Sequence, residues 1–384
     1  MLKWWTHRPG PIGLDIGHDG IKMLQLDSIG KAVSAVAGAC WRFPDNVGTD
    51  PALRRRFAVD AVREMLAAGG FKGRSVVTCL GFDEMTVKQV RLPHMSDEEL
   101  KSAVRWEADE RFGFQVDPDL LHYVVAGEVR QGSEFRDEVI LMGARAETVD
   151  EHLKMLEEMR LVPVCVDAEP ACLFRPFERY LRRQGDVDQV TVLVDVGASA
   201  ARVLFGRGRQ VKFIKSIPIG GRRLTEAVAE RLGLEFDQAW RLRRRIMRDG
   251  RDGGAPAVQA AGGEKAYRAV YDAIRPVVEE IAREVGLCLR YCAVTFRGDR
   301  WDAATLVGGE AYDPCLRELM GDHANVRCQI GQPLAGIDVS QVDLETDHRG
   351  PMCEWAVATG LAMRHLFGQA KDREKKDGVR QLSA

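Results

Sequence analysis

The N-terminal stretch of the chain alternates apolar and polar positions in a way that predicts a β-hairpin, a helix and a further strand. Apolar residues alternate through 12–16, a polar Gly-His-Asp-Gly turn occupies 17–20, and the alternation resumes through 21–26. Asp-Gly within such a turn is typical of a hairpin whose central residues take positive φ. Apolar positions at helical spacing then run through 51–68, and a short apolar strand follows at 75–80.

A second segment begins with a helix signal and continues with two strands. Ser96 and Glu99 have the spacing of a capping box immediately before an apolar helical pattern. Strand-like stretches at 121–129 and 138–144 are separated by a polar run, and helical spacing returns at 148–160. We therefore predict a compact insert of two strands with flanking helices.

The hairpin pattern of the N-terminal region recurs in the second half of the chain. Alternating valines at 190–194 lead into an Asp-x-Gly turn at 195–197, just as the first strand leads into the Asp-x-Gly turn at 15–17. A buried-type strand at 303–307 and a C-terminal helix at 354–366 follow. Duplicated signals at such a separation predict two related lobes rather than two turns of one sheet.

Composition narrows the classes of function. The 384 residues carry 55 Lys and Arg against 57 Asp and Glu, a balance that argues against nonspecific binding to nucleic acid. The nine cysteines are scattered without a CxxC pair, which fits a reducing compartment. Cys288 and Cys292 are interpreted as helix packing, with a zinc site as the alternative. Because no apolar run reaches about 18 residues and residues 1–8 lack a signal-peptide pattern, we expect a cytoplasmic chain that does not span a membrane.

Three glycine-bearing turns that follow strands carry the candidate chemistry. They lie at 15–17, 195–197 and 307–309. Glycine allows backbone N–H groups to approach phosphate oxygens, and the carboxylates of Asp15 and Asp195 can hold a hydrated magnesium ion. Each turn alone is weak evidence, because Asp-x-Gly turns are common. Their order and spacing together predict a clamp on a nucleotide.

In order and spacing these turns resemble the phosphate and adenosine loops of the actin, Hsp70 and FtsA superfamily. Within it, the chain resembles the PilM family of type IV pilus assembly proteins through residues 12–17, 92–110, 217–227 and 356–361. The resemblance implies an α/β, actin-like ATPase fold in which two RNase H-like lobes surround a nucleotide cleft. It also implies a small inserted subdomain of the 1C type.

The resemblance implies an order of domains along the chain as well. The expected segments are the first part of lobe 1 (1–84), the inserted subdomain (85–166), the return to lobe 1 (167–190), lobe 2 (191–350) with a flexible loop (249–263), a C-terminal helix packing back on lobe 1 (351–369) and a charged tail (370–384).

ATP and Mg are the cofactors that the resemblance implies, with Asp15 and Asp195 as the metal ligands and no catalytic residue assigned. The residues expected against the nucleotide are Asp15, Gly17, His18, Asp19, Gly20, Lys22, Asp195, Gly197, Ala198, Ser199, Gly220, Gly221, Trp240, Arg243, Gly308, Gly309 and Glu310.

Several of these residues depart from the family's pattern. His18, Asp19 and Gly20 stand where hydroxyl residues are usual, and a carboxylate about 4 Å from a phosphate is repelled by about 4 kcal/mol at an effective dielectric of about 20. Glu310 replaces a glycine of the adenosine loop, and Arg243 stands where a lysine is usual. These departures leave open a weak ATPase and a pseudo-ATPase whose loops are kept as structural turns.

Aromatic and basic residues near these positions each allow two interpretations. The arginine run within 241–248 is interpreted as a solvated helix face, with contact to a nucleotide or an acidic partner as the alternative. Trp240 is a candidate to stack on adenine. Trp106, on the predicted insert helix, is either a core residue or part of a peptide groove.

As a function, the resemblance implies an assembly scaffold that binds the N-terminal peptide of a PilN-like inner-membrane protein in a groove near the insert. The chain would then lie at the cytoplasmic face of the inner membrane, held there through its partner. The alternatives are an active actin-like ATPase and an FtsA-like filament protein, and a homo-oligomer is left open. The tail lacks the apolar face of a membrane-targeting helix, which disfavours the filament alternative.

Overall fold

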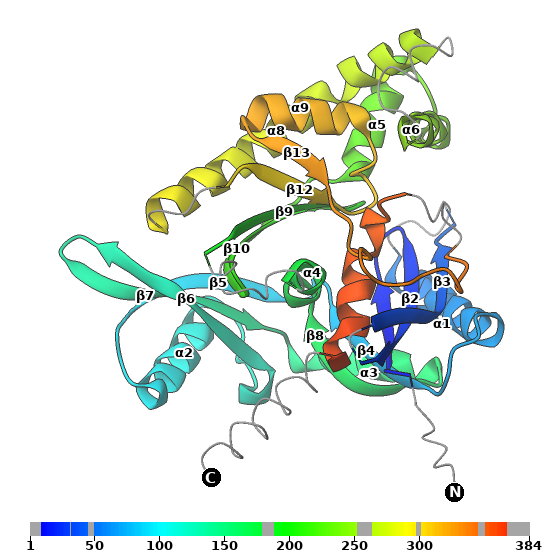
Figure 1. Ribbon diagram of the computed structural model, residues 1–384. Helices are drawn as coiled ribbons and strands as arrows, with labels where there is room; N and C mark the ends of the chain where they lie inside the picture. Colours follow the sequence, from blue (N-terminus) through cyan, green and yellow to red (C-terminus); the bar gives the residue numbers. More distant parts are fainter. Residues whose placement is uncertain are drawn as a thin grey trace, which may run out of the picture. The chain divides into compact units, whose positions relative to one another are not determined.

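The computed structural model describes most of the chain (Figure 1). The N-terminal residues 1–8, residues 252–262 of the predicted flexible loop and the predicted charged tail lie outside the described residues. The described ranges are 9–30, 32–44, 50–178, 188–251, 263–296, 301–344 and 350–366.

The chain forms two compact units, each built from separate segments. The first unit comprises Met1–Gly81, Val149–Pro176 and Pro333–Ala384, and the second unit comprises Phe82–Thr148 and Phe177–Gln332. The domain boundaries expected from the sequence stay predictions.

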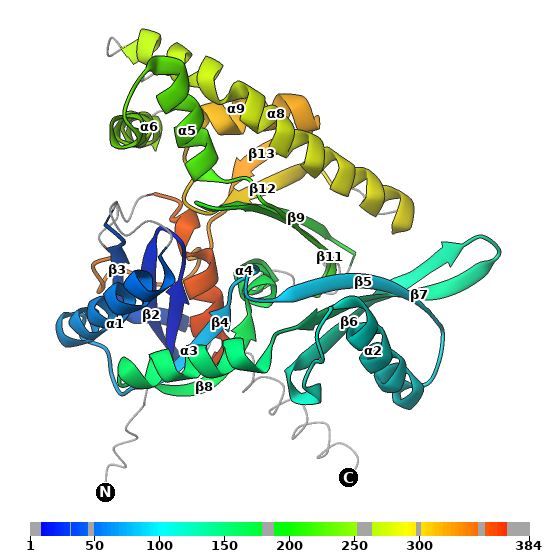
Figure 2. The same ribbon diagram turned by 180° about the vertical axis from the view of Figure 1, so that it is seen from behind.

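A five-stranded sheet forms the centre of the first unit (Figure 2), in the order β3-β2-β1-β4-β8. Its antiparallel part consists of β1 (Ile12–Ile16), β2 (Gly20–Ile29) and β3 (Ala32–Arg42). β4 (Ser75–Leu80) and β8 (Val162–Ala168) continue it in parallel. The predicted hairpin and third strand are confirmed as β1, β2 and β4, whereas β3 and β8 were not predicted.

Helices cover both faces of this sheet. On one face lie α1 (Pro51–Ala68) and α3 (Ala146–Glu158), and on the other lie α4 (Glu169–Glu178) and the helix 356–366, which follows a 3-10 turn at Cys353–Trp355. The predicted helices at 51–68, 148–160 and 354–366 are thereby confirmed, with ends that differ by a few residues.

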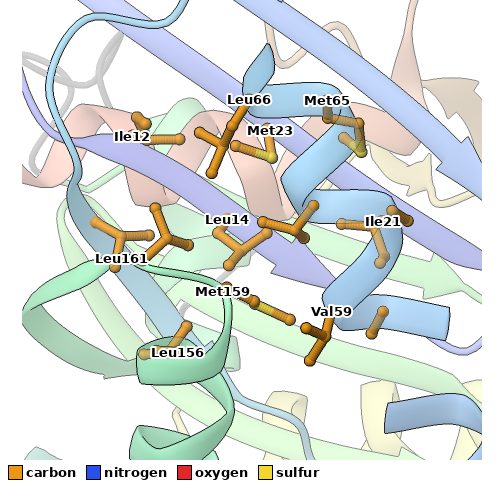
Figure 3. Packing of buried hydrophobic residues seen from close by; sticks show 14 residues of the cluster. Ile12, Leu14, Ile21, Met23, Val59, Met65, Leu66, Leu156, Met159 and Leu161 are labelled. Carbon is orange, nitrogen blue, oxygen red and sulfur yellow. The ribbon is translucent and has the colours of Figure 1, made fainter. Parts of the chain in front are cut away.

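The larger apolar core of the first unit lies between its sheet and the pair α1 and α3. Figure 3 shows strand side chains such as Leu14 and Ile21 packed against Val59 of α1 and against Leu156 and Met159 around the end of α3. Side chains alternate across a strand, so the residues between these apolar positions face the opposite side of the sheet. That side receives the helix 356–366.

The second unit contains a sheet with the same topology as the first. Its order is β11-β10-β9-β12-β13, in which β9 (Val190–Val196), β10 (Ala201–Arg207) and β11 (Gln210–Ile217) are antiparallel. β12 (Ala303–Val307) and β13 (Arg327–Ile330) continue it in parallel. Because three antiparallel strands followed by two parallel ones occur in both units, the predicted duplication of lobes is confirmed.

Helices of the second unit accompany this sheet in the described part of the chain (Figure 1). They are α5 (Gly221–Leu232), α6 (Phe236–Arg251), α8 (Glu264–Thr295) and α9 (Pro314–Ala324). Cys288 and Cys292 lie on the buried face of α8, as the packing interpretation predicted. Among the described residues, no helix combines the length and the apolar character that crossing a bilayer needs.

The predicted insert is a three-stranded sheet with one covering helix, and it belongs to the second unit. The strand order is β5-β7-β6, with β5 (Thr86–Pro93), β6 (Leu121–Gln131) and β7 (Glu134–Gly143). The polar run between the two predicted strands is mostly strand, because the hairpin extends both strands into solvent. α2 (Asp97–Arg111) begins with the predicted capping box, which is confirmed.

Candidate functional site

The first predicted phosphate loop is the turn between β1 and β2. The Gly17 N–H donates to the Gly20 carbonyl at 2.9 Å and closes the turn. Neither Asp19 nor Gly20 takes a positive φ, so the predicted turn conformation is wrong. Glycine is required at position 20 for another reason, since a Cβ there would lie 2.3 Å from the Trp41 carbonyl oxygen of β3. The close approach of a neighbouring strand explains this residue.

Basic side chains neutralise both carboxylates of the first loop. Asp19 forms an ion pair with Arg42 of β3. Asp15 lies 4.0 Å from the Lys22 ammonium, across the β1–β2 hairpin. The repulsion of phosphate expected from Asp19 is therefore offset by a cation that the sequence analysis missed. The pairing of β3 with β2 brings the two residues together, because Arg42 stands opposite Gly20, next to Asp19.

Arg54 of α1 fixes the backbone of the same turn. Its Nη2 donates to the carbonyls of Gly17 at 3.2 Å and His18 at 2.8 Å. Its guanidinium also stacks over Phe43, with 4.1 Å between Cζ and the ring centroid. The carbonyls of the turn thus accept from the protein's own arginine, and His18 is exposed.

The second predicted phosphate loop joins β9 and β10 in the second unit. Asp195 is 5% exposed, and its Oδ2 accepts a hydrogen bond from Arg202 Nη1 at 2.9 Å. The two residues stand directly opposite each other in the hairpin register, so this ion pair could have been predicted from the turn position. Ser199 is exposed at the tip of the turn.

Arg243 of α6 is the centre of a buried ionic network. It is 2% exposed, so the interpretation of the arginine run as a solvated face is wrong at this position. Its Nη2 donates to Glu310 Oε2 at 2.7 Å and to Asp313 Oδ2 at 2.8 Å. Although burial opposes the charged form, these two carboxylates outweigh it and raise the pKa of Arg243. We call Arg243, Arg244, Glu310 and Asp313 the ionic network.

Asp313 also caps the helix α9. Its Oδ1 accepts from the amides of Cys315 and Leu316 and so caps α9, which begins at Pro314. Asp before Pro is a recognisable helix start, and this signal could have drawn attention to Asp313.

Arg244 completes the network at its edge. Its guanidinium approaches Glu310 Oε1 at 3.4 Å and lies 5.3 Å from the Trp240 ring. Trp240, the candidate for adenine stacking, thus packs beside a cation of the same helix. The other arginines of the run are exposed, as predicted for a solvated face; they are Arg241, Arg245 and Arg248.

The structure gathers most of the predicted nucleotide residues into two clusters, one in each unit. The first unit holds the turn residues Asp15 to Lys22. In the second unit a hydrogen bond joins Gly221 N–H to Gly197 O at 2.9 Å, and another joins Glu310 N–H to Val196 O at 3.1 Å. Gly308, with φ +87°, packs so closely on Asp195 that a Cβ there would lie 2.4 Å from Oδ1. The roles of these residues toward a ligand stay predictions.

Two related lobes, each with a phosphate-loop-like turn after its first strand, define a protein of the actin-like ATPase fold. The family described as type IV pilus assembly protein PilM matches residues 13–249 of the chain. The chain belongs to this PilM family of type IV pilus assembly proteins.

Solved structures agree with this assignment. A chain of the PilM-PilN type IV pilus biogenesis complex is 25% identical, with a TM-score of 0.71, and the match covers 92% of this chain and 98% of that one. The ethanolamine utilization protein EutJ from Carboxydothermus hydrogenoformans is 15% identical, with a TM-score of 0.53 and coverage of 93% and 90%. MreB5 of Spiroplasma citri bound to AMPPNP is 12% identical, with a TM-score of 0.50 and coverage of 97% and 99%. The last two show the fold alone.

Proposed function

We propose that this chain is a scaffold of type IV pilus assembly, or of a related secretion system, that binds the N-terminal peptide of a PilN-like inner-membrane protein. The observation that carries the proposal is the match over nearly the whole of both chains with a chain of the PilM-PilN complex. On this proposal the chain lies at the cytoplasmic face of the inner membrane and reaches the bilayer through its partner. Self-association stays a prediction.

The insert offers a surface suited to such a peptide. Leu100, Val104 and Ala108 bury one face of α2 in the insert, whereas Trp106 is 64% exposed. The interpretation of Trp106 as a core residue is therefore wrong. Large exposed aromatic residues commonly contribute to partner contacts, because they bury much apolar area at small entropic cost. This exposure supports a role of Trp106 in peptide binding.

A direct test is calorimetric titration of the purified protein with a synthetic peptide of the PilN-like protein's N-terminus from the same genome. We expect saturable binding that Trp106→Ala weakens at least about tenfold, which is about 1.4 kcal/mol. Phe135→Ala is the matched control, because Phe135 is 61% exposed in the same insert but lies near the start of β7, at the hairpin tip. Both variants should have the Tm of the wild type. No binding by the wild type, or intact piliation after removal of the insert surface, would refute the proposal.

The proposed scaffold does not require ATP turnover. The MreB5 match was solved with AMPPNP, so the actin-like fold is compatible with an adenine nucleotide. In this chain, however, each carboxylate of the predicted metal pair has a basic partner within its own unit. We therefore propose a protein that is at most a weak ATPase. Peptide affinity measured with and without Mg-ATP should then be the same.

A further inference from the structure

We infer that the side chain of Glu310, held by Arg243, closes the adenosine side of the nucleotide site in the second unit, so that Mg-ATP does not bind there. The inference rests on the proposed scaffold function and deepens it, since it states that the scaffold works without the cofactor of its fold class. It uses contacts of the second unit alone.

The space that a nucleotide would use beside α5 is filled by protein. A Cβ built on Gly221, the first residue of α5, would lie 2.3 Å from Glu310 Oε1. Glycine at this position commonly admits the close approach of a ligand oxygen. Here it admits the carboxylate oxygen of Glu310, whose residue is only 4% exposed. An internal anion thus stands where a phosphate or ribose oxygen would have to enter.

The backbone donors at the start of α5 are also in use. The N–H of Gly221 donates to Gly197 O at 2.9 Å, and the N–H of Arg222 donates to Ala198 O at 2.8 Å. The first amides of a helix bind anions because they have no partner within the helix. In this chain the carbonyls of the second loop are the partners of these two amides, which are therefore already bound within the protein.

The two terminal nitrogens of Arg243 have no N–H left for a ligand. Its Nη1 donates to Gly221 O and to Thr225 Oγ1, both at 3.0 Å. Its Nη2 donates to Glu310 and Asp313, which together use the four terminal N–H bonds of the guanidinium. The remaining Nε is buried and has no hydrogen-bond partner among the described residues. The lysine of the family pattern is a compact charge with N–H donors on one nitrogen. The terminal N–H groups of Arg243, in contrast, are all bound to oxygens of the protein.

The charges of the network balance, so these four residues contribute no net positive charge toward an anion. Arg243 and Arg244 face the carboxylates of Glu310 and Asp313, two cations against two anions. A triphosphate brings several negative charges and would need an excess of positive groups or a metal ion to be bound.

The predicted metal ligand of this unit does not fit a hydrated magnesium ion. Magnesium keeps several water molecules and needs open space around a carboxylate oxygen. Asp195 Oδ2 is bound by Arg202, and its Oδ1 lies against the backbone of Gly308. Neither oxygen is therefore free to face a hydration shell.

The test compares the wild type with Glu310→Gly and Glu310→Gln. Glu310→Gly restores the glycine of the family pattern, empties the space beside Gly221 and leaves the pair of Arg243 with Asp313 intact. Glu310→Gln keeps the volume filled and serves as the matched control. Binding of Mg-ATP is followed by calorimetry and by the rise in Tm, neither of which depends on turnover.

We expect no binding of millimolar Mg-ATP by the wild type or by Glu310→Gln, and saturable binding by Glu310→Gly that is at least about tenfold tighter than the detection limit. Saturable binding by the wild type would overturn the inference whatever the variants do. If Glu310→Gly folds but does not bind Mg-ATP, Glu310 is not the residue that excludes the nucleotide, and the inference is overturned. If Glu310→Gly does not fold, exchange protection at the start of α5 in the wild type with and without Mg-ATP decides, because bound nucleotide must protect it.

The same preparations are titrated with the PilN-like peptide. Peptide binding without ATP binding supports both the scaffold and the closed site. If the wild type binds both ATP and the peptide, the closed nucleotide site is refuted and the scaffold function stands. If it binds neither, the scaffold function is refuted and the closed nucleotide site stands.

Discussion

Replacing Arg243 by methionine should destabilise the second unit strongly, because it leaves two buried acids without their cation. The Arg243 side chain is 2% exposed and is bound by both Glu310 and Asp313. Methionine fills a similar volume, so the cost comes mainly from the uncompensated charges. Removal of one member of a buried ion pair commonly costs about 3–5 kcal/mol. The free energy of unfolding of a whole domain is only about 5–15 kcal/mol, so the substitution would remove a large part of the stability of the second unit.

The assay has to resolve the two units. We would follow urea unfolding together with hydrogen exchange of α5 and α6, because exchange reports the unit that holds the network. In Arg243→Met the exchange of these helices should accelerate, while β1 and β2 of the first unit should keep their protection. The double variant Arg243→Met/Glu310→Gln removes one of the stranded charges and should be more stable than the single variant by about 1–2 kcal/mol.

A cost below about 1 kcal/mol for Arg243→Met would refute this prediction, since that would mean that the acids tolerate each other without the arginine. The prediction also fails if the double variant is no more stable than the single one. Equal acceleration of exchange in both units would show instead that the substitution acts on the whole chain and not on the network.

Three further predictions concern the first unit and the insert. Gly360→Ala should cost at least about 3 kcal/mol, because a Cβ there would lie 1.8 Å from the Cys172 carbonyl; a smaller loss in urea would contradict the backbone contact. His152, bonded to Thr78 at 3.2 Å, is buried and neutral, and burial lowers its pKa from 6.5 to about 4. Below pH 6.5 only the unfolded chain gains this proton, so stability should fall by about 1.4 kcal/mol per pH unit down to about pH 4, and His152→Gln should flatten that slope. Ser96→Ala should cost about 1 kcal/mol in thermal melts by removing the N-cap of α2, with an unchanged Tm as the contrary result.

The parts of the fold that follow from local pattern could be predicted from the sequence. Alternation at 12–16 and 190–194, helical spacing at 51–68 and the capping box at Ser96 all correspond to elements of the structure. The repeated Asp-x-Gly turns gave the duplication of lobes, because each turn is a property of a few neighbouring residues. Such signals depend on backbone preference and burial, which act over short distances in the chain.

Other elements carried weaker or conflicting local signals. β8 contains Pro163, which weakens its strand signal, although a proline is tolerated on the edge strand of a sheet. β3 is rich in alanine, which has low strand propensity, and it is held in place by pairing with β2. Tertiary pairing decides both cases, and a single sequence does not display it.

The candidate site shows the same division between local and distant information. The sequence placed Arg243 and Glu310 near a nucleotide but not near each other, since 67 positions separate them and nothing local links their charges. Arg202 was within reach of prediction, because the hairpin register sets it opposite Asp195. A departure from a family pattern therefore acquires its meaning only from the partner that compensates it.

The composition of the first unit from three separate segments has a consequence for biosynthesis. During translation the strands of its N-terminal part emerge first, yet the helix 356–366 follows only after every residue of the second unit has left the ribosome. Trp355, Ala358 and Ala362 cover an apolar cluster that contains Leu24 and Leu26 of β2. Until they arrive, that face of the nascent sheet is open to water and to other chains. The first unit to begin synthesis is thus the last to be completed, and ribosome stalling before residue 350 should release a product that depends on chaperones.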